Sequence, residues 1–360
     1  MKIFFLTVCF FIQTVYSCTT DLDCSLNGLC INTICVCDLP WSGTSCTQLS
    51  YKTSTPAIGK SVYNISDPKN TWNGPIFGPD IDTMYHIYVP LYNIGSLGNP
   101  TTMKHGISNT IEGPYDFLSL PDITTLGGEN PAMLVYNDAS RGGMLVYSLW
   151  IGGGVLISTT PYGPFTRIPS FSYPGGNPAP IYHKGVFFMT NQATTEIYMT
   201  SGLFSGSTWS VYSNISHTML PQNIDYHVED PYMWIDKRNN WHIINHAYSN
   251  YQYDSCSTSY LSAHFYSQDD GKNWFYSSQP YTHLVQYDDG TSFEYVTLER
   301  PNLHFSPSGE LTHINLAADL VTTAEKGCAN RTAHSHYGHT PCDNCKWEDH
   351  AGTIIIALAT

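Results

Sequence analysis

A short pattern recurs five times along this chain and limits the folds that it can adopt. In each copy a polar or small residue precedes a proline, and the proline opens an apolar run of strand length. Successive prolines lie 47 to 70 residues apart. The five copies are "NGPIF" at Pro75, "ENPAMLVY" at Pro131, "GNPAPIY" at Pro178, "EDPYMWI" at Pro231 and "ERPNLHF" at Pro301. A period of about 50 residues is typical of propeller blades with four strands each.

A second pattern follows most of these copies: a strand that ends in Ser or Thr leads into a turn with a glycine and an aromatic residue, as in "SNTIEGPYDF" and "STTPYGPFTR". Runs rich in β-branched and aromatic residues predict strands at 85–92, 144–150, 185–190, 241–248 and 312–320. No segment sustains a helical period. We therefore predict an all-β fold, a five-bladed β-propeller over residues 51–360, in which a strand near residues 58–66 closes the ring against the C-terminal run. A β-sandwich is the alternative.

The first 17 residues have the layout of a cleaved signal peptide, with Lys2, an apolar run from Ile3 to Val15 and a small residue at Ser17. The run is short for a membrane span, and an uncleaved anchor is the alternative. Removal of this segment takes away Cys9 and leaves an even number of the 11 cysteines, which suits an oxidising compartment. We expect a secreted, extracellular glycoprotein. Its possible N-glycosylation sequons are at Asn64, Asn214 and Asn330.

Six cysteines crowd into residues 18–46, and a segment of this size needs cross-links because it cannot bury a sufficient core. The spacing C-x5-C-x5-C-x4-C-x-C-x8-C, with "WSG" before the last cysteine, resembles an epidermal-growth-factor-like module at residues 18–50. The resemblance implies the pairs Cys18–Cys30, Cys24–Cys35 and Cys37–Cys46, whereas spacing alone leaves 15 connectivities open. We expect the module to be a spacer or an adhesion unit for a surface or protein partner, without calcium.

The residues before the five prolines are the candidate site. In a propeller the innermost strand of each blade begins beside the central axis, and proline is tolerated at a first strand position. These residues should therefore meet at one end of the channel: Asn73-Gly74, Glu129-Asn130, Gly176-Asn177, Glu229-Asp230 and Glu299-Arg300. Burial and like charge would push carboxyl pKa values apart there, as glycosidic hydrolysis requires of its acid and base. The structural alternative is that these side chains satisfy backbone groups and pair as Glu299 with Arg300.

The stretches "EDPYMWIDKRNNWHIINH" and "LERPNLHFSPSGELTHI", with "NPAP" and two "GP" turns upstream, resemble the five-bladed propellers of glycoside hydrolase family 43 and its relatives. The resemblance covers roughly residues 55–360. It implies a glycosidase that acts with inversion and has its general acid in the fourth blade, where Glu229 matches. It also implies an aspartate base in the first blade and an orienting aspartate in the third.

The chain departs from that family pattern at both aspartate positions. The first blade has Asn73 and Gly74 there, and the third has Asn177. An amide cannot accept a proton from water. Either one of the other acids supplies the base, or the protein binds sugar without cleaving it. The candidate catalytic residues are therefore Glu229, Asp230, Glu129 and Glu299.

Aromatic residues make up 14% of the chain, and we expect most of them to fill the space between blades. Trp150, Trp234 and Trp241 lie near predicted core strands, whereas Trp72 lies beside the first strand opening and is the best candidate for stacking against a sugar ring. The predicted sugar-binding residues are Trp72, Asn73, Asn130, Asn177 and Arg300.

Late in the chain, "CANRTAHSHYGHTPCDNCKWEDH" has a C-x2-C pair and several histidines, which is compatible with zinc. In an oxidising compartment we favour two disulfides among Cys256, Cys328, Cys342 and Cys345. No cofactor is predicted. A calcium ion on the propeller axis, held near a histidine as in some family members, is compatible with the resemblance but has no support in the residues. No phosphate loop, dinucleotide fingerprint or nucleophile elbow occurs.

The net charge of −14 disfavours nucleic acid and anionic membrane surfaces as partners. Two functions remain. The first is a secreted glycosidase that acts on a polysaccharide or oligosaccharide. The second is a catalytically inactive carbohydrate-binding or adhesion protein.

Overall fold

The chain folds almost wholly into β-strands. The computed structural model describes residues 17–52, 57–58, 62–63, 70–79, 82–92, 102–118, 130–216, 226–249, 260–286, 290–295, 298–319 and 351–359. In these ranges the helical elements are two short 3₁₀ turns, Asp21–Cys24 and Ala139–Arg141. None of the helices in the described ranges could reach across a bilayer. The prediction of an all-β fold is confirmed.

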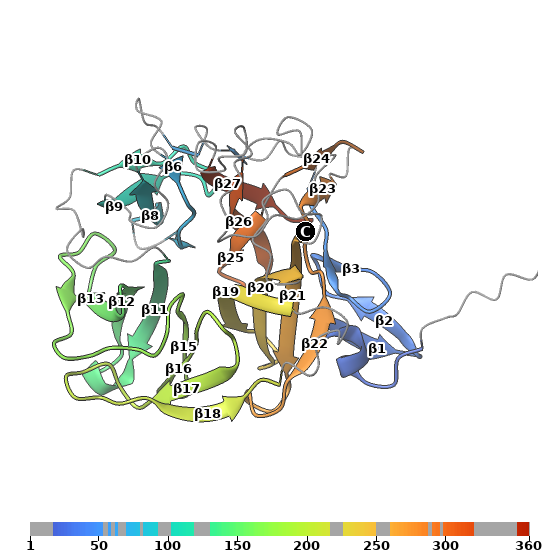
Figure 1. Ribbon diagram of the computed structural model, residues 1–360, viewed down its shortest axis with the longest axis horizontal. Helices are drawn as coiled ribbons and strands as arrows, with labels where there is room; N and C mark the ends of the chain where they lie inside the picture. Colours follow the sequence, from blue (N-terminus) through green and yellow to red (C-terminus); the bar gives the residue numbers. More distant parts are fainter. Residues whose placement is uncertain are drawn as a thin grey trace, which may run out of the picture.

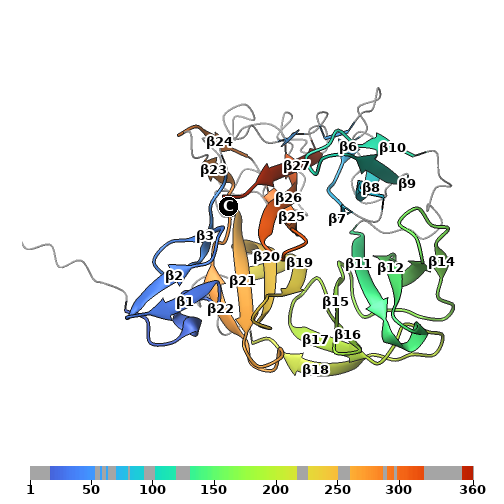
Figure 2. The same ribbon diagram turned by 180° about the vertical axis from the view of Figure 1, so that it is seen from behind.

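Five antiparallel sheets form the blades of a propeller, arranged in a ring in chain order (Figures 1 and 2). Blade 1 has β6 (Asn70–Thr71), β7 (Ile76–Phe77), β8 (Tyr85–Tyr92), β9 (Thr102–Ser108) and β10 (Asp116–Phe117). Blade 2 has β11 (Ala132–Asp138), β12 (Met144–Ile151), β13 (Gly154–Ser158) and β14 (Thr166–Arg167). Blade 3 has β15 (Ala179–His183), β16 (Val186–Thr190), β17 (Glu196–Thr200) and β18 (Ser210–Asn214). The predicted five-bladed β-propeller is therefore present.

Blades 4 and 5 complete the ring. Blade 4 has β19 (Tyr226–Ile235), β20 (Trp241–Ser249), β21 (Tyr260–Ser267) and β22 (Phe275–Ser278). Blade 5 has β25 (Leu298–Phe305), β26 (Leu311–Asp319), β27 (Ala351–Ala357) and β5 (Ala57–Ile58). In blade 5, Ile58 pairs with Ile354 and Ala57 with Ile355, so a segment before blade 1 supplies the last strand. The predicted closure of the ring against the C-terminal run is confirmed, but the closing strand is Ala57–Ile58, at the start of the predicted range 58–66.

The second recurring pattern, in which a strand ends in Ser and a turn with Thr and Gly follows, forms the same turn in blades 1 and 2. We call it the Ser-Thr-Gly turn. The Ser108 and Ser158 hydroxyls accept the backbone N–H of the residue two positions later, at 3.2 and 3.1 Å. The Thr110 hydroxyl donates to the Gly113 carbonyl at 2.7 Å, which closes the turn. Gly113 has a φ of +91°, and a Cβ there would lie 2.6 Å from the Val62 carbonyl oxygen, so only glycine fits.

Large aromatic side chains fill the space between blades, as predicted. Trp150 and Trp241 are fully buried. Trp241 packs edge-on against Phe188 of the neighbouring blade 3. Within blade 4, Trp234 stacks on its cross-strand partner His242 with a 4.8 Å separation of ring centroids. These contacts rigidify the blades that carry the inner strands.

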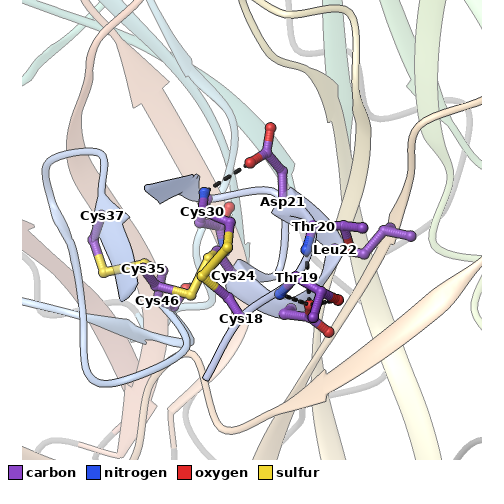
Figure 3. Close-up of a disulfide and its surroundings, with 12 residues drawn as sticks. Cys18, Thr19, Thr20, Asp21, Leu22, Cys24, Cys30, Cys35, Cys37 and Cys46 are labelled. Carbon is purple, nitrogen blue, oxygen red and sulfur yellow. Dashed lines mark hydrogen bonds between the residues drawn. A yellow bond between two sulfur atoms is a disulfide. The ribbon is translucent and has the colours of Figure 1, made fainter. Parts of the chain in front are cut away.

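The N-terminal segment is a small module with three disulfides, Cys18–Cys30, Cys24–Cys35 and Cys37–Cys46 (Figure 3). The predicted pairing is confirmed. The module contains the strand pairs β1 (Gly28–Ile31) with β2 (Ile34–Cys37) and β3 (Trp41–Ser42) with β4 (Gln48–Leu49). The other four cysteines of the predicted pairs, Cys256, Cys328, Cys342 and Cys345, lie outside the described residues, as do Asn64 and Asn330. Asn214 is exposed at the end of β18, so that sequon stays a prediction.

The module packs directly on blades 4 and 5, beside β22 and the β23 (Leu284–Gln286) and β24 (Ser292–Glu294) pair (Figures 1 and 2). Trp41 is buried and stacks on His264 of β21 with centroids 5.4 Å apart. The Leu49 N–H donates to the Pro280 carbonyl at 2.8 Å. Arg238 forms an ion pair with Asp38 at 2.6 Å. The module therefore shares a core with the propeller and is not held away from it, which corrects the expectation of a spacer.

Candidate functional site

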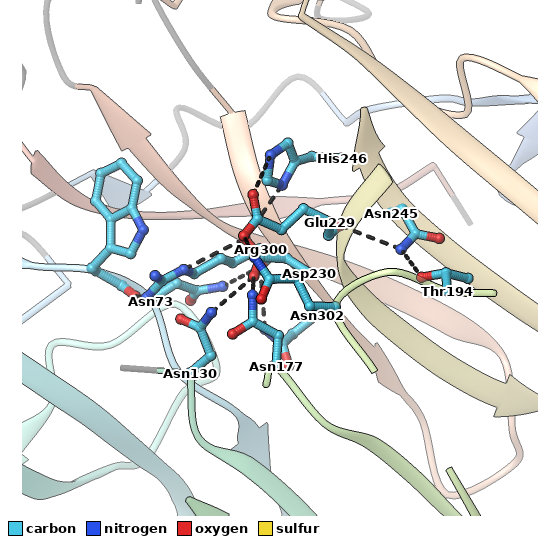
Figure 4. A network of polar contacts seen from close by, with 12 residues as sticks. Asn73, Asn130, Asn177, Thr194, Glu229, Asp230, Asn245, His246, Arg300 and Asn302 are labelled. Carbon is cyan, nitrogen blue, oxygen red and sulfur yellow. Dashed lines mark hydrogen bonds and ion pairs between the residues drawn. The ribbon is translucent and has the colours of Figure 1, made fainter. Parts of the chain in front are cut away.

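Polar side chains from all five blades meet at the propeller axis (Figure 4). We name the set Asn73, Asn130, Asn177, Asp230 and Arg300 the axial ring. The amides of Asn130 and Asn177 both donate to Asp230 Oδ1, the former at 2.9 Å. Arg300 Nε lies 3.5 Å from Asp230 Oδ2, and Asn73 Nδ2 donates to the Arg300 carbonyl at 2.7 Å. The structure thus brings together one predicted site residue from each of the five blades.

β-Bulges place two of these side chains, Asp230 in β19 and Arg300 in β25. The prediction that Pro231 and Pro301 open their strands is wrong, because β19 begins at Tyr226 and β25 at Leu298. The register of β19 against β20 shifts between Glu229 and Tyr232, and the register of β25 against β26 shifts between Glu299 and Asn302. Within these bulges Asp230 and Arg300 each have a φ of +51°. A bulge adds one residue and re-aims its side chain, and a non-glycine residue with positive φ is held at a cost in energy. Both strained residues therefore carry axial side chains.

Asp230 is the centre of the ring and is only 6% exposed. Its carboxylate contacts two amide donors, Arg300 and the buried His246, whose Nδ1 lies 3.3 Å from Asp230 Oδ2. A buried carboxylate requires such compensation, because an uncompensated charge is costly in a low dielectric. Asp230 is consequently anchored from four directions.

His246 connects the two adjacent acids of the "EDP" stretch. It lies on β20 directly opposite Glu229 in the strand register, and its Nε2 lies 4.0 Å from Glu229 Oε2. Burial alone would lower the pKa of His246, but the contact with Asp230 and the negative charges of Glu299 and Glu229 outweigh burial and raise that pKa. Sequence reasoning missed His246. The sequence shows only a histidine within the run "WHIINHAY", and the structure shows that this position is fully buried.

Glu299 is the carboxyl group with the most altered proton affinity in this cluster. Desolvation raises its pKa to about 7, the negative charges of Asp230 and Glu229 act in the same direction, and His246 and Arg300 oppose them. One carboxylate oxygen of Glu299, one of Asp230 and a ring nitrogen of His246 all lie within 4.8 Å of one another. Glu299 therefore keeps its proton to a higher pH than an ordinary glutamate does.

Glu229 is held by the turn that joins β16 to β17. Gln192 Nε2 donates to Glu229 Oε1, and Asn245 Nδ2 donates to the Glu229 carbonyl at 3.3 Å and to Thr194 Oγ1 at 2.9 Å. The Glu229 side chain is 15% exposed, against 6% for Asp230. Glu229 is therefore both fixed in orientation and more accessible than its neighbour. Sequence reasoning also missed Gln192, which has no distinguishing local pattern.

A cavity of about 340 Å³ is lined by the axial ring and by residues that follow the prolines. Glu229, Glu299 and His246, which precede the ring along the strands or come from β20, are not among its lining residues. Apolar members of that lining are Met133, Ile181, Met233, Ile235 and Phe305.

Trp72 does not offer a free face for stacking. Its side chain is 2% exposed, and the Arg300 guanidinium lies 5.6 Å from the indole centroid. The prediction that Trp72 stacks on a sugar is wrong because the indole is buried beneath Arg300, where a cation–π contact holds the guanidinium. Glu129 lies outside the described residues, so its predicted role is unexamined.

The cluster Asp230, His246 and Glu299 has the ligand types of a cation site, but its charges do not fit one. Arg300 already lies beside Asp230, and the raised pKa of His246 favours a protonated ring that repels a cation. A metal ligand histidine must be neutral. An axial calcium stays a prediction with no support in these residues.

Comparison with known proteins gives similarity to solved structures only. No family model and no curated protein matches the chain. A thermostable family-43 glycoside hydrolase has 13% identity and a TM-score of 0.48, over 82% of this chain and 90% of that one. A family-43 β-xylosidase/α-arabinofuranosidase from a compost microbial metagenome has 10% sequence identity and a TM-score of 0.49, over 86% of this chain and 95% of that one. An endo-arabinase from Bacteroides thetaiotaomicron has 12% sequence identity and a TM-score of 0.45, over 74% of this chain and 92% of that one. Similarity at this level assigns no activity to this chain.

Proposed function

We propose that the protein is a secreted glycoside hydrolase-like protein that cleaves a neutral polysaccharide or oligosaccharide at the axial site. The observation that supports this most is the cluster of Glu229, Asp230 and Glu299 around His246. Two carboxyl groups with different proton affinities are what glycosidic hydrolysis requires, because one donates a proton while the other is ionised. Desolvation raises the pKa of Glu299 to about 7, so this carboxyl group keeps its proton to a higher pH than an ordinary glutamate does.

Glu229 is the proposed general acid. Its side chain is more exposed than that of Asp230, and hydrogen bonds from Gln192 and Asn245 fix its position. A general acid must reach the leaving oxygen within hydrogen-bond distance. His246 Nε2 lies 4.0 Å from Glu229 Oε2, so its charge acts on this carboxyl group through space.

Asp230 is proposed to orient the site and not to act as the base. Its oxygens already contact Asn130, Asn177, Arg300 and His246, so taking a proton from water would break these contacts. Glu299 and Glu129 are the two candidates for the base. An inverting pair needs a separation of about 6.5–9.5 Å to admit water, and on this proposal one of them lies that far from Glu229.

The test is a panel of aryl glycosides and polysaccharides offered to the wild-type protein and to Glu229→Gln, Glu299→Gln and Glu129→Gln. We expect turnover by the wild type, loss of about 10²–10⁴-fold in Glu229→Gln, and a comparable loss in one of the other two variants. Proton NMR of the first-formed anomer checks inversion. Full turnover in Glu229→Gln would remove Glu229 from the acid role.

A second function, sugar binding without cleavage, is favoured by one observation. Asn73 and Asn177 occupy axial positions where a hydrolase of the resembled family has carboxylates, and both amides are used in hydrogen bonds within the ring. Saturable binding of an oligosaccharide with no turnover by the wild type would select this function.

A further inference from the structure

Two buried histidines lie beneath the contact between the disulfide-rich module and blade 4. His242 Nδ1 and His264 Nε2 are 3.0 Å apart, and the two rings stack with centroids 5.2 Å apart. Trp41 of the module stacks on His264, and neither histidine is more than 1% exposed. Trp41 is therefore part of the cover that keeps water from His264.

The short distance between the two ring nitrogens limits how many protons the pair can hold. One nitrogen must carry a hydrogen and the other must accept it. If both rings were cationic, both nitrogens would carry a hydrogen and the bond between them would be lost. Burial also lowers the pKa of His242 and holds the pKa of His264 well below its ordinary value. The docked module is therefore compatible with a neutral pair but not with a doubly protonated pair.

The charged groups that face the pair do not compensate a second proton. Asp236 Oδ2, in the turn between β19 and β20, lies 3.5 Å from His242 Nε2. Arg238 of the same turn lies 3.6 Å from Asp236 and 2.6 Å from Asp38 of the module. Two carboxylates and one guanidinium leave a single negative charge, which balances at most one cationic histidine.

Water has access to the His242 end of the pair. A cavity of about 620 Å³ between the module and the propeller is lined by Asp38, Trp41, Asp236 and His242. The charged groups on its far wall, Lys237 and Glu310, pair with each other and add no net charge. Protons can therefore enter at Asp236 and His242, whereas His264 lies behind them.

Blade 1 has the same arrangement of side chains with a different cover. Asp82 lies 3.3 Å from His86 Nε2, and His86 Nδ1 lies 2.9 Å from His105 Nε2. There Tyr88 of the same blade stacks on His105, with centroids 4.4 Å apart. In blade 4 the aromatic cover, Trp41, instead belongs to a module that has its own three disulfides. Blade 1 is therefore an internal reference for blade 4.

We infer that the His242–His264 pair makes docking of the module sensitive to acid: protonation of both rings separates Trp41 from His264 and undocks the module, while the propeller and the disulfides stay intact. The inference goes beyond the proposed hydrolysis and does not depend on it. Both histidines have a lowered pKa when the module is docked. The docked state is therefore favoured above the ordinary histidine value of about 6.5 and loses stability relative to the undocked state as pH falls below that value.

Amide hydrogen exchange of the full chain measures docking, because the Leu49 N–H donates across the interface to the Pro280 carbonyl at 2.8 Å. Each histidine that is neutral when docked and cationic when undocked contributes up to about tenfold per pH unit. We expect the protection factor of Leu49 to fall about 10- to 100-fold per pH unit between pH 6 and 5. Two reference amides should change less: Asn27, which donates to Cys24 within the module, and Ile168, which donates to Val155 within blade 2.

Three variants assign the effect to the pair. His264→Gln keeps a side-chain donor for His242 Nδ1 but cannot become cationic, so it should lose about tenfold of the change per pH unit. His105→Gln, the equivalent substitution in blade 1, should keep the wild-type pH dependence of Leu49. Asp38→Asn, which removes an ion pair from the same interface, should also keep it.

Three results would overturn the inference. One is a Leu49 protection factor that does not change between pH 7 and 5. Another is an equal loss of protection at Leu49 and Ile168, which would show that acid unfolds the whole chain. The third is a pH dependence that His264→Gln keeps or that Asp38→Asn abolishes. If His264→Gln does not fold, the three amides of the wild-type protein decide alone.

Discussion

His246 Nδ1 lies 3.3 Å from Asp230 Oδ2 at the centre of the propeller, and both side chains are almost completely buried. Asp230 also faces Arg300 at 3.5 Å. One carboxylate therefore compensates two cationic groups from different blades. This relationship joins blades 4 and 5 at the axis and predicts how the fold and the site respond to substitution.

Asp230→Asn keeps the shape of the side chain but removes its charge. We expect the free energy of unfolding to fall by about 3–5 kcal/mol, because His246 and Arg300 lose their buried partner. Urea unfolding followed by tryptophan fluorescence measures this. Asp38→Asn is the matched control, since its exposed ion pair with Arg238 contributes about 0–1 kcal/mol. Equal losses in the two variants would contradict the central role of Asp230.

Glu299 gives stability a defined pH dependence. Its folded-state pKa of about 7 exceeds the ordinary value, so the folded protein binds more protons than the unfolded chain between about pH 4.5 and 7. Ionising Glu299 then costs on the order of 3 kcal/mol, and its contribution to stability declines as pH rises through this window. The raised pKa of His246 acts in the same direction.

The measurement is the difference in unfolding free energy between the wild type and Glu299→Gln across pH 4.5–8. The two proteins are compared because buried neutral histidines give stability the opposite pH dependence. Burial lowers the pKa of His105 to about 3, and this destabilises the fold in acid equally in the wild type and in Glu299→Gln. We expect the wild type to lose stability relative to Glu299→Gln as pH rises. Parallel curves would show that Glu299 titrates normally.

Trp41 tests whether the disulfide-rich module is part of the propeller core. Trp41→Ala should lower the free energy of unfolding of the whole chain by about 3–5 kcal/mol, because the indole packs on His264 of blade 4. Leu39→Ala, at a side chain that is 64% exposed in the same module, should change it by about 0.5 kcal/mol or less. An unchanged unfolding midpoint of the propeller in Trp41→Ala would mean that the module contributes nothing to it.

Gln192 is predicted to position Glu229. Gln192→Leu removes the donor to Glu229 Oε1, and a hydrogen bond to a charged group corresponds to about a 10- to 100-fold change in kcat/KM. The pH profile of kcat/KM should shift as well, which a merely structural defect would not cause. Gln48→Leu, on an exposed part of the module, is the control. An unaltered profile in Gln192→Leu would exclude the positioning role.

The architecture was predictable because its signals are local. Prolines such as Pro178 and Pro231 mark the inner strand of each blade. Pro178 directly precedes β15 as predicted, whereas Pro231 and Pro301 lie inside β19 and β25, at bulges that require no ladder hydrogen bond from them. The Ser-Thr-Gly turns repeat for the reason seen at Ser108 and Gly113, where a hydroxyl and a positive φ close the connection. Convergence on the axis then follows from the propeller itself.

The details of the site were less predictable because they depend on contacts between distant segments. Gln192 reaches Glu229 across 37 residues and from another blade. His246 is opposite Glu229 only through the register of β19 and β20. The prediction that Trp72 stacks on a sugar was wrong for the same reason. The sequence shows that Trp72 lies beside a strand start, but it does not show that Arg300, 228 residues away, covers the indole.

The most direct test of the account is the dependence of Glu229→Gln on the leaving group, once the panel has identified a sugar that the wild type cleaves. A 2,4-dinitrophenyl glycoside needs no protonation of its leaving oxygen, whereas a 4-methylphenyl glycoside does. We predict that Glu229→Gln loses at least 100-fold in kcat/KM on the 4-methylphenyl substrate and less than about 10-fold on the dinitrophenyl substrate. Equal losses on both substrates would contradict proton donation by Glu229 at the axial site.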